Sequence, residues 1–217
     1  MSQAAIFDMD GTLVDSDALA WRSAEEGLRE YWARRGLPAA IPPRAEVRAL
    51  VGLPSLEYFA RLLPAERRGD AEEVRTLVAG AEVQRLKSGE GRLYPEVRET
   101  LEALRARGVK LGLVSNCGRV YFGANLQYLR LRDLVEVAYC LDDHPTKAEN
   151  VRKALAFLGA RSGIMVGDRA ADLEAGRANG LRTVGCTYGF GAREELASAD
   201  WRIESPASLL DIPFAGD

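Results

Sequence analysis

Residues 7–16 read FDMDGTLVDS, and two aspartates, Asp8 and Asp10, stand two residues apart directly after an apolar run. That run, residues 3–8 (QAAIFD), predicts a short buried strand, because apolar residues without alternation suit a strand covered on both faces. Both aspartates therefore fall at the end of a strand, and Gly11 permits the sharp turn that follows. The sequence thus predicts two like charges close together at one edge of a sheet.

Further apolar runs predict more strands of the same kind, and helical patterns alternate with them from residue 95 onward. The helical patterns stop at Gly108, Gly159 and Gly180, where a glycine favours the left-handed cap that ends a helix. Strand–helix alternation predicts an α/β fold, with a doubly wound parallel-sheet (Rossmann-like) core. The additional strands are expected at residues 109–115, 135–140, 163–167, 181–186 and 201–205.

Residues 17–92 break this alternation, because no strand pattern occurs there. Ala20, Ala24, Leu28 and Tyr31 recur at helical spacing, and prolines separate three further helical stretches. The pattern predicts an all-helical cap domain inserted at 16–91. The α/β catalytic core would then consist of residues 1–15 and 92–217.

Composition narrows the class of protein. The chain has 217 residues, 47% hydrophobic and 28% charged, which is ordinary for a globular protein. The net charge of −3 shows no basic excess, so we expect no nucleic-acid partner. No apolar run approaches the roughly 18 residues of a membrane span, and the residues before Asp8 leave no room for a signal peptide. We therefore expect a cytoplasmic protein with no membrane partner, a monomer or small homo-oligomer. Its three distant cysteines, among them Cys117, are expected to be reduced thiols.

Small polar clusters fall at the predicted carboxyl ends of strands, where ligands bind in open α/β sheets. Each alone is weak evidence, because an aspartate after a strand is commonly a helix cap and a lone lysine is commonly solvated. Together, carboxylates that converge on one crevice would repel each other, and Mg²⁺ would relieve that repulsion. A hydroxyl, an ammonium group and free turn amides would bind a phosphoryl group. The clusters are Asp8 with Asp10, Ser115 with Asn116, Lys147, and Asp168 with Asp172.

These clusters, in this order, resemble the four signature motifs of the haloacid dehalogenase (HAD) superfamily. The first is DMDGTL at 8–13, and the last is the Gly167–Asp168 pair with Asp172. The helical insert resembles the α-helical cap of that superfamily, and residues 187–210 are similar to the closing segment of its phosphoglycolate phosphatase-like branch. Ala148 and Glu96 depart from the branch pattern, where proline and glycine are frequent.

The resemblance implies a Mg²⁺-dependent phosphatase that forms an aspartyl-phosphate intermediate. Asp8 would attack phosphorus, and Asp10 would donate a proton to the leaving alkoxide and then accept one from water. It also implies that the carboxylate of Asp8, the backbone carbonyl of Asp10 and Asp168 hold the metal. If Asp168 opened its helix, it would share one face with Asp172, so that one could contact metal while the other steadies Lys147. The expected phosphate-binding residues are Gly11, Thr12, Ser115, Asn116 and Lys147.

The cap would close over the crevice and exclude water and large substrates, so we expect a small phosphorylated metabolite as substrate. The loop at 48–55 (RALVGLPS) is the predicted substrate-facing part of the cap. Arg48 would pair there with a substrate carboxylate, although a solvated surface arginine is the commoner case. His144 is interpreted as a loop residue, and Cys117 as a residue bordering the pocket without a chemical role.

Other functions remain open at this point. A dehalogenase is the first rival, but such enzymes need no metal and typically lack the second aspartate, which is present here as Asp10. A phosphomutase, phosphonatase or pyrophosphatase of the same superfamily is possible, because details of the cap decide. From another class, a phospho-acceptor signalling module or an inactive binding protein would use similar residues. Repeated release of phosphate from an ester, with and without Mg²⁺, separates these alternatives.

Overall fold

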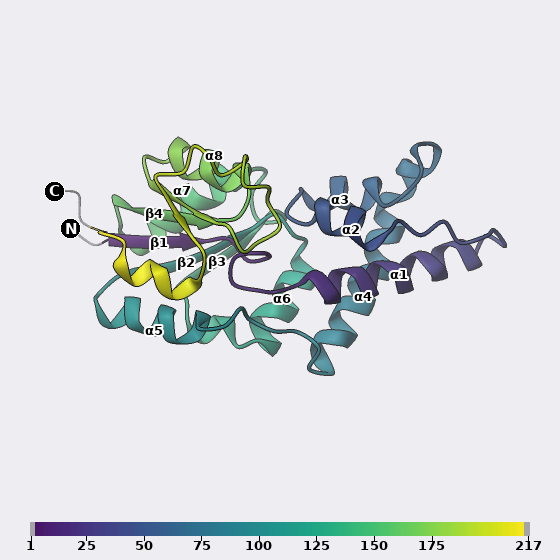
Figure 1. Cartoon of the computed structure of the whole chain (residues 1–217). Helices are drawn as coiled ribbons and strands as arrows, with labels where there is room; N and C mark the ends of the chain where they lie inside the picture. The colour runs from purple at the N-terminus through teal and green to yellow at the C-terminus, as the bar shows by residue number, and fades with distance from the viewer. Residues whose placement is uncertain (1–2, 215–217) are drawn as a thin grey trace.

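The computed structural model describes residues 3–214, which form a parallel sheet with helices on both faces and a helical extension at one end (Figure 1). The strands are arranged in the order β3-β2-β1-β4-β5-β6, and every neighbouring pair is parallel. The order changes direction at β1, which makes the edge beside β1 and β4 the expected ligand site of a doubly wound fold. The strands are β1 (Gln3–Phe7), β2 (Lys110–Ser115), β3 (Val137–Cys140), β4 (Ser162–Gly167), β5 (Arg182–Cys186) and β6 (Trp201–Ile203).

All six predicted strands are present, which confirms the predicted fold class. They differ from the predicted ranges only at their ends, because apolar periodicity does not fix where hydrogen bonding stops. Successive residues of β1 alternate between the two faces: Ala5 and Phe7 belong to one apolar cluster, Ala4 and Ile6 to another. The central strand is therefore buried on both sides, as its unbroken apolar sequence predicts.

Two layers of helices produce that burial. The first cluster is completed by α5 (Val97–Ala106) and α6 (Arg119–Tyr128), and the second by α7 (Lys147–Leu158) and α8 (Ala170–Ala178). Gly159 ends α7 at a φ of 62°, in the left-handed region where a residue with a side chain is strained. The glycine stop predicted from sequence is therefore the C-terminal cap of α7.

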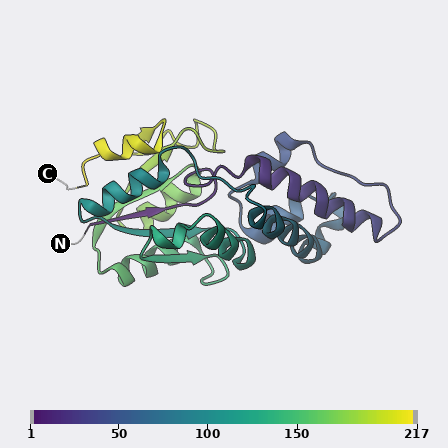
Figure 2. The ribbon, with the colours of Figure 1, turned by 90° about the horizontal axis from the view of Figure 1, so that it is seen from below.

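The extension is entirely helical within the described residues. Its elements are α1 (Asp17–Ala33), α2 (Arg44–Leu50), α3 (Ser55–Arg61), a short 3-10 helix (Ala65–Asp70) and α4 (Ala71–Lys87). These helices form an apolar cluster of their own, in which the predicted face of α1 (Ala20, Ala24, Leu28 and Tyr31) is buried. Figure 2 shows the helices gathered beyond one end of the sheet.

Two chain segments connect the extension to the sheet, and they lie side by side. Asp15 donates its backbone N–H to the carbonyl of Arg92 at 3.1 Å, and Tyr94 donates to the carbonyl of Leu13 at 3.0 Å. The predicted domain limits, at 15/16 and 91/92, fall in this paired connection. The division into a cap at 16–91 and a core stays a prediction.

Candidate active site

The loop that follows β1 carries the first two predicted site residues. Asp8 and Asp10 are both buried. Gly11, which follows Asp10, has a φ of 80°. A Cβ atom on Gly11 would lie 2.3 Å from the Asp168 carboxylate. Glycine is therefore needed here for two reasons: the backbone conformation, and the close approach of the Asp168 carboxylate.

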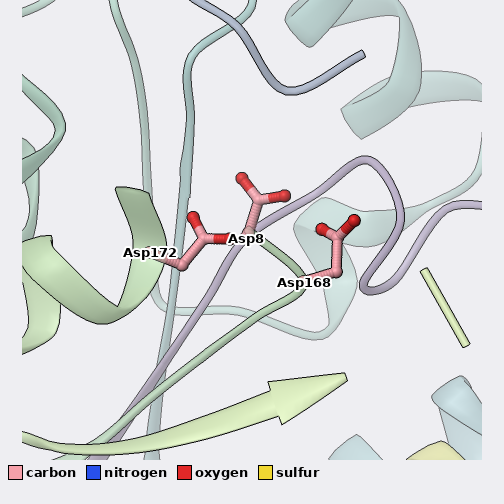
Figure 3. A group of neighbouring side chains, drawn as sticks. All are labelled: Asp8, Asp168 and Asp172. Atoms are coloured by element: carbon pink, nitrogen blue, oxygen red, sulfur yellow. The ribbon is translucent and has the colours of Figure 1, made fainter. Parts of the chain in front are cut away.

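Three carboxyl groups from separate stretches of backbone meet at this edge of the sheet (Figure 3). Asp8 follows β1, Asp168 follows β4, and Asp172 lies in the first turn of α8. One carboxylate oxygen from each of the three residues lies within 4.8 Å of the corresponding oxygens of the other two. All three residues are buried. The convergence predicted from the sequence is present in the structure.

Lys147 brings the balancing positive charge. Its ammonium group forms an ion pair with Asp8 at 2.5 Å and a second ion pair with Asp172. Burial alone would lower the pKa of Lys147, but the charges of Asp172 and Asp8 outweigh it and raise the pKa overall. The lysine therefore stays protonated, and it contacts the carboxylate for which nucleophilic attack is predicted.

The carboxyl of Asp168 is held by the loop after β5. Its Oδ2 accepts hydrogen bonds from the backbone N–H groups of Phe190, at 2.7 Å, and Gly191, at 3.3 Å. Thr12 donates its hydroxyl to Oδ1 at 3.2 Å. Burial and the charge of Asp172 nevertheless raise the pKa of Asp168 to about 7.

Burial also raises the pKa of Asp8 well above its usual value, and only Lys147 opposes this. The cluster therefore has more negative charge than the single ammonium group balances, and its donors are hard carboxylate oxygens. That donor set fits Mg²⁺, whose usual protein ligands are one or two carboxylates with water and phosphate oxygens. The residues present are suited to hold the ion predicted from the sequence.

The predicted arrangement in which Asp168 and Asp172 share one face of a helix is not formed. The helix α8 begins at Ala170, so Asp168 precedes it and does not open it. Asp172 instead accepts a hydrogen bond from the backbone N–H of Arg169 at 2.9 Å and pairs with Lys147. Its position corresponds to the alternative in which one aspartate steadies the lysine.

Asp10 is not part of the carboxylate cluster and has a different partner. Tyr121 on α6 donates its hydroxyl to Oδ1 of Asp10 at 2.7 Å. Burial raises the pKa of Asp10, while the bond from Tyr121 works in the opposite direction. Tyr121 was missed in the sequence reasoning, because a tyrosine at helical spacing is typical of a core residue and no motif marks it.

A cavity of about 630 Å³ opens beside these residues, between the sheet edge and the helical extension. Ser115 and Asn116, at the end of β2, lie on its wall, as do Asp8 and Asp10. Asn116 also donates its amide to the carbonyl of Gly52, at 3.0 Å, in the predicted substrate-facing loop. That loop contributes further wall residues, namely Val51, Gly52, Leu53 and Ser55.

Arg48 is not among the residues that line this cavity. Its guanidinium donates to the carbonyl of Gly189 at 2.9 Å and lies 5.0 Å from the ring centre of Phe190. The structure thus gives it protein partners, and its expected role with a substrate carboxylate stays a prediction. His144 packs edge-on against Tyr139, and Cys117 borders the cavity.

Arg169, next to Asp168, joins the sheet to the cap loop. Its guanidinium donates to the carbonyls of Val51, at 2.6 Å, and Ala49, at 2.7 Å, and it pairs with Glu195 at 3.1 Å. No sequence motif distinguishes this arginine from the many others. Through these contacts, the loop after β4 is connected directly to Val51 in the wall of the cavity.

The structure combines a parallel α/β sheet, buried carboxylates at the carboxyl ends of its strands and a helical insert next to them. The family model of the haloacid dehalogenase-like hydrolases matches residues 5–186, and the chain belongs to that family. This confirms both the family and the enzyme class predicted from the motifs.

Curated relatives extend the similarity over nearly the whole chain. A phosphoglycolate phosphatase from Synechococcus elongatus is 34% identical over 220 residues, covering 96% of this chain and 95% of the relative. A pyrophosphatase, PpaX, from Anoxybacillus flavithermus is 30% identical and covers 95% of this chain and 94% of its own. The resemblance to the phosphoglycolate phosphatase-like branch is thereby confirmed, although the relatives carry two different substrate names.

Solved structures show the same fold. A haloacid dehalogenase-like hydrolase from Streptococcus pneumoniae superposes with a TM-score of 0.79 at 23% identity, with 97% of each chain covered. CbbY from Rhodobacter sphaeroides, solved in complex with phosphate, gives 0.78 at 21% identity, with 96% of each chain covered. Among the described residues, no helix is long and apolar enough to cross a membrane.

Proposed function

We propose that this protein is a Mg²⁺-dependent phosphatase that hydrolyses a small phosphate monoester through an aspartyl-phosphate on Asp8. The observation that carries the proposal is the ion pair between Lys147 and Asp8 at 2.5 Å, inside a buried cluster of three carboxylates. The family and the phosphatase names of its relatives support it. The second substrate name among the relatives, pyrophosphatase, keeps a phosphoanhydride as an alternative substrate.

In the proposed mechanism, Asp8 attacks phosphorus and the bond to the leaving oxygen breaks. Lys147 lies against the attacking carboxylate, where it neutralises charge on the transferring phosphoryl oxygens. The carboxylates of Asp8 and Asp168, with the backbone carbonyl of Asp10, would hold Mg²⁺, which supplies charge neutralisation to the phosphoryl group when bound. Ser115, Asn116, Gly11 and Thr12 are the proposed phosphate-binding residues.

Asp10 is the proposed acid and base. Its raised pKa favours the protonated form that must donate to the leaving alkoxide, and the raised value has burial as its main cause. After the leaving alcohol departs, the same carboxylate accepts a proton from the water that attacks the aspartyl-phosphate. Tyr121 donates to Oδ1 of this carboxyl and thereby fixes its orientation.

Phosphate release from p-nitrophenyl phosphate, with Mg²⁺ and with EDTA, tests this proposal. We expect many turnovers per enzyme molecule with Mg²⁺ and loss of activity with EDTA. A single slow phosphorylation would favour the signalling module, and no reaction at all would favour the inactive binding protein. Acid-quenched mass spectra during turnover should show about 80 Da added to the peptide that contains Asp8, the mass of one phosphoryl group. Turnover without that adduct in any quench would contradict the covalent mechanism.

A further inference from the structure

The cap side of the cavity contains a buried carboxyl that the proposed mechanism does not use. Glu82, on α4, is 6% exposed and lines the same cavity as Asp8 and Asp10. Burial and the charge of Asp10 raise its pKa well above the usual value, and among the described residues no hydrogen-bond donor counteracts this. A buried carboxyl without a partner costs free energy, which a ligand in the cavity would recover.

Two hydroxyl groups on the same wall also lack partners. Tyr58, on α3, is 8% exposed, and its Oη has no hydrogen-bond partner among the described residues; the same holds for Oγ of Ser55. Both residues line the cavity. Each hydroxyl can donate one hydrogen bond and accept another, so the wall is suited to groups that do both.

The cationic groups of the cavity, by contrast, already have anionic partners. In the described part of the chain its wall includes two of them, Arg75 and Arg119. Arg75 pairs with Glu72 at 2.7 Å, and Arg119 with Asp143 at 2.8 Å. A carboxylate on the substrate would find no unpaired cation among these described wall residues, so its buried charge would stay uncompensated.

Much of the remaining wall is apolar, with Leu53, Phe59, Ala79 and Val120 among its residues. Such a wall disfavours any fully charged group, including an ammonium group. An alcohol hydroxyl is uncharged, and it can donate to Glu82 while it accepts from Tyr58. The unpartnered polar groups and the apolar lining therefore both favour an uncharged group that carries a hydroxyl.

We propose that the substrate's leaving group is an uncharged, hydroxyl-bearing alcohol, that Glu82 and Tyr58 of the cap bind its free hydroxyl, and that carboxylate-bearing leaving groups are rejected. This assignment rests on the proposed phosphatase function and specifies its substrate class. Glu82 and Tyr58 are then specificity residues, whereas Asp8 and Lys147 act on the phosphoryl group common to all esters. It also separates this chain from a phosphatase for phosphoglycolate, whose leaving group carries a carboxylate.

Four esters with a two-carbon leaving group test the proposal with little change in size. They are 2-hydroxyethyl phosphate, 2-phosphoglycolate, phosphoethanolamine and ethyl phosphate, and kcat/KM is measured for each by phosphate release with Mg²⁺. We expect 2-hydroxyethyl phosphate to exceed ethyl phosphate by about tenfold, the value of one good hydrogen bond. It should exceed 2-phosphoglycolate by about a hundredfold, because a buried unpaired charge costs more.

Variants of the cap then identify the residues responsible. Glu82→Leu should reduce the ratio of 2-hydroxyethyl phosphate to ethyl phosphate from about ten to near one, and Tyr58→Phe should reduce it about threefold. Glu82→Gln keeps a hydrogen-bonding group and should lower the ratio less than Glu82→Leu. Ratios within one preparation do not depend on how much of the variant is folded. Glu57→Gln is the matched control, because Glu57 is an exposed acid on the same cap that pairs with Arg61; it should leave the ratio unchanged.

The outcomes are distinct. If 2-phosphoglycolate or phosphoethanolamine is the best of the four, or if Glu82→Leu leaves the ratio unchanged, the substrate assignment is wrong. If all four esters are hydrolysed equally, the phosphatase proposal stands and the assignment falls. If neither these esters nor p-nitrophenyl phosphate releases phosphate, the proposed function is wrong and this inference falls with it.

Discussion

The sheet edge and the cap face each other across one cavity, but they differ in how their polar groups are satisfied. At the sheet edge, Asp8, Lys147 and Asp172 are paired with one another. On the cap side, Oη of Tyr58 is buried without a hydrogen-bond partner among the described residues, and the pKa of the buried Glu82 is raised with no hydrogen bond to lower it. The protein itself therefore pre-organises the groups proposed for the phosphoryl chemistry, whereas the cap groups proposed to bind the leaving group have hydrogen-bonding capacity left for a ligand.

The largest effect is expected on the sheet side of this comparison. Asp8→Asn keeps the size of the side chain and removes the attacking carboxylate, so turnover should fall by at least about 10⁴-fold for every ester. Phosphate release under single-turnover conditions measures it. Because the loss concerns the shared phosphoryl group, it should not depend on the leaving group. Activity of Asp8→Asn near that of the parent would remove the basis for assigning chemistry to this edge.

A second prediction separates the apolar cores of the two regions. Leu28 is fully buried in the cap cluster and Leu113 in the core cluster. Either one replaced by alanine should lower the free energy of unfolding by about 2–5 kcal/mol. Hydrogen exchange distinguishes them: Leu28→Ala should accelerate exchange in α1 and α4 more than in β1 and β4, because the cap has its own cluster. Equal acceleration in both regions would mean that they open as one unit.

The third prediction concerns the contact between the two regions. Arg169→Met keeps an apolar stem and removes the hydrogen bonds to the carbonyls of Ala49 and Val51. The cavity wall formed by Val51 would be less well held, and kcat/KM should fall by about tenfold for all esters. Arg61→Met is the control, since the one ion pair of Arg61 among residues 3–214 is with the exposed Glu57 on the cap surface. If both variants lose activity equally, the link between Arg169 and the cap loop has no special role.

The same contrast explains how much the sequence alone predicts. Parallel strands are apolar throughout, and their carboxyl ends meet at one edge, so Asp8, Ser115 and Asp168 could be placed together from the pattern. The helices of the cap could be predicted, but not which of their residues face the cavity. Glu82 lies in α4 among other acidic residues, and only the packing of α4 against the sheet side distinguishes it. Tyr121 and Arg169 were missed for the same reason, because their partners are distant in sequence.

The smallest predicted effect concerns pH and the metal. The folded pKa of Asp168 is raised to about 7, so the folded protein binds a proton there more tightly than the unfolded chain does. In the absence of a divalent ion, that carboxyl therefore contributes most to stability at low pH, and its contribution is lost as pH rises toward and through 7. Mg²⁺ would compensate the ionised form.

Mg²⁺ should consequently raise the unfolding midpoint more at pH 8 than at pH 6, by a difference of about 1 kcal/mol, or a few degrees. Differential scanning fluorimetry with Mg²⁺ and with EDTA at both pH values measures this difference. Asp168→Asn is the informative comparison, because it removes the titrating group and should abolish most of the pH dependence of the Mg²⁺ effect. If Mg²⁺ raised the unfolding midpoint of the parent equally at both pH values, stabilisation by Mg²⁺ would not depend on ionisation of Asp168. The carboxylate cluster would then not be the place where the metal stabilises the sheet edge.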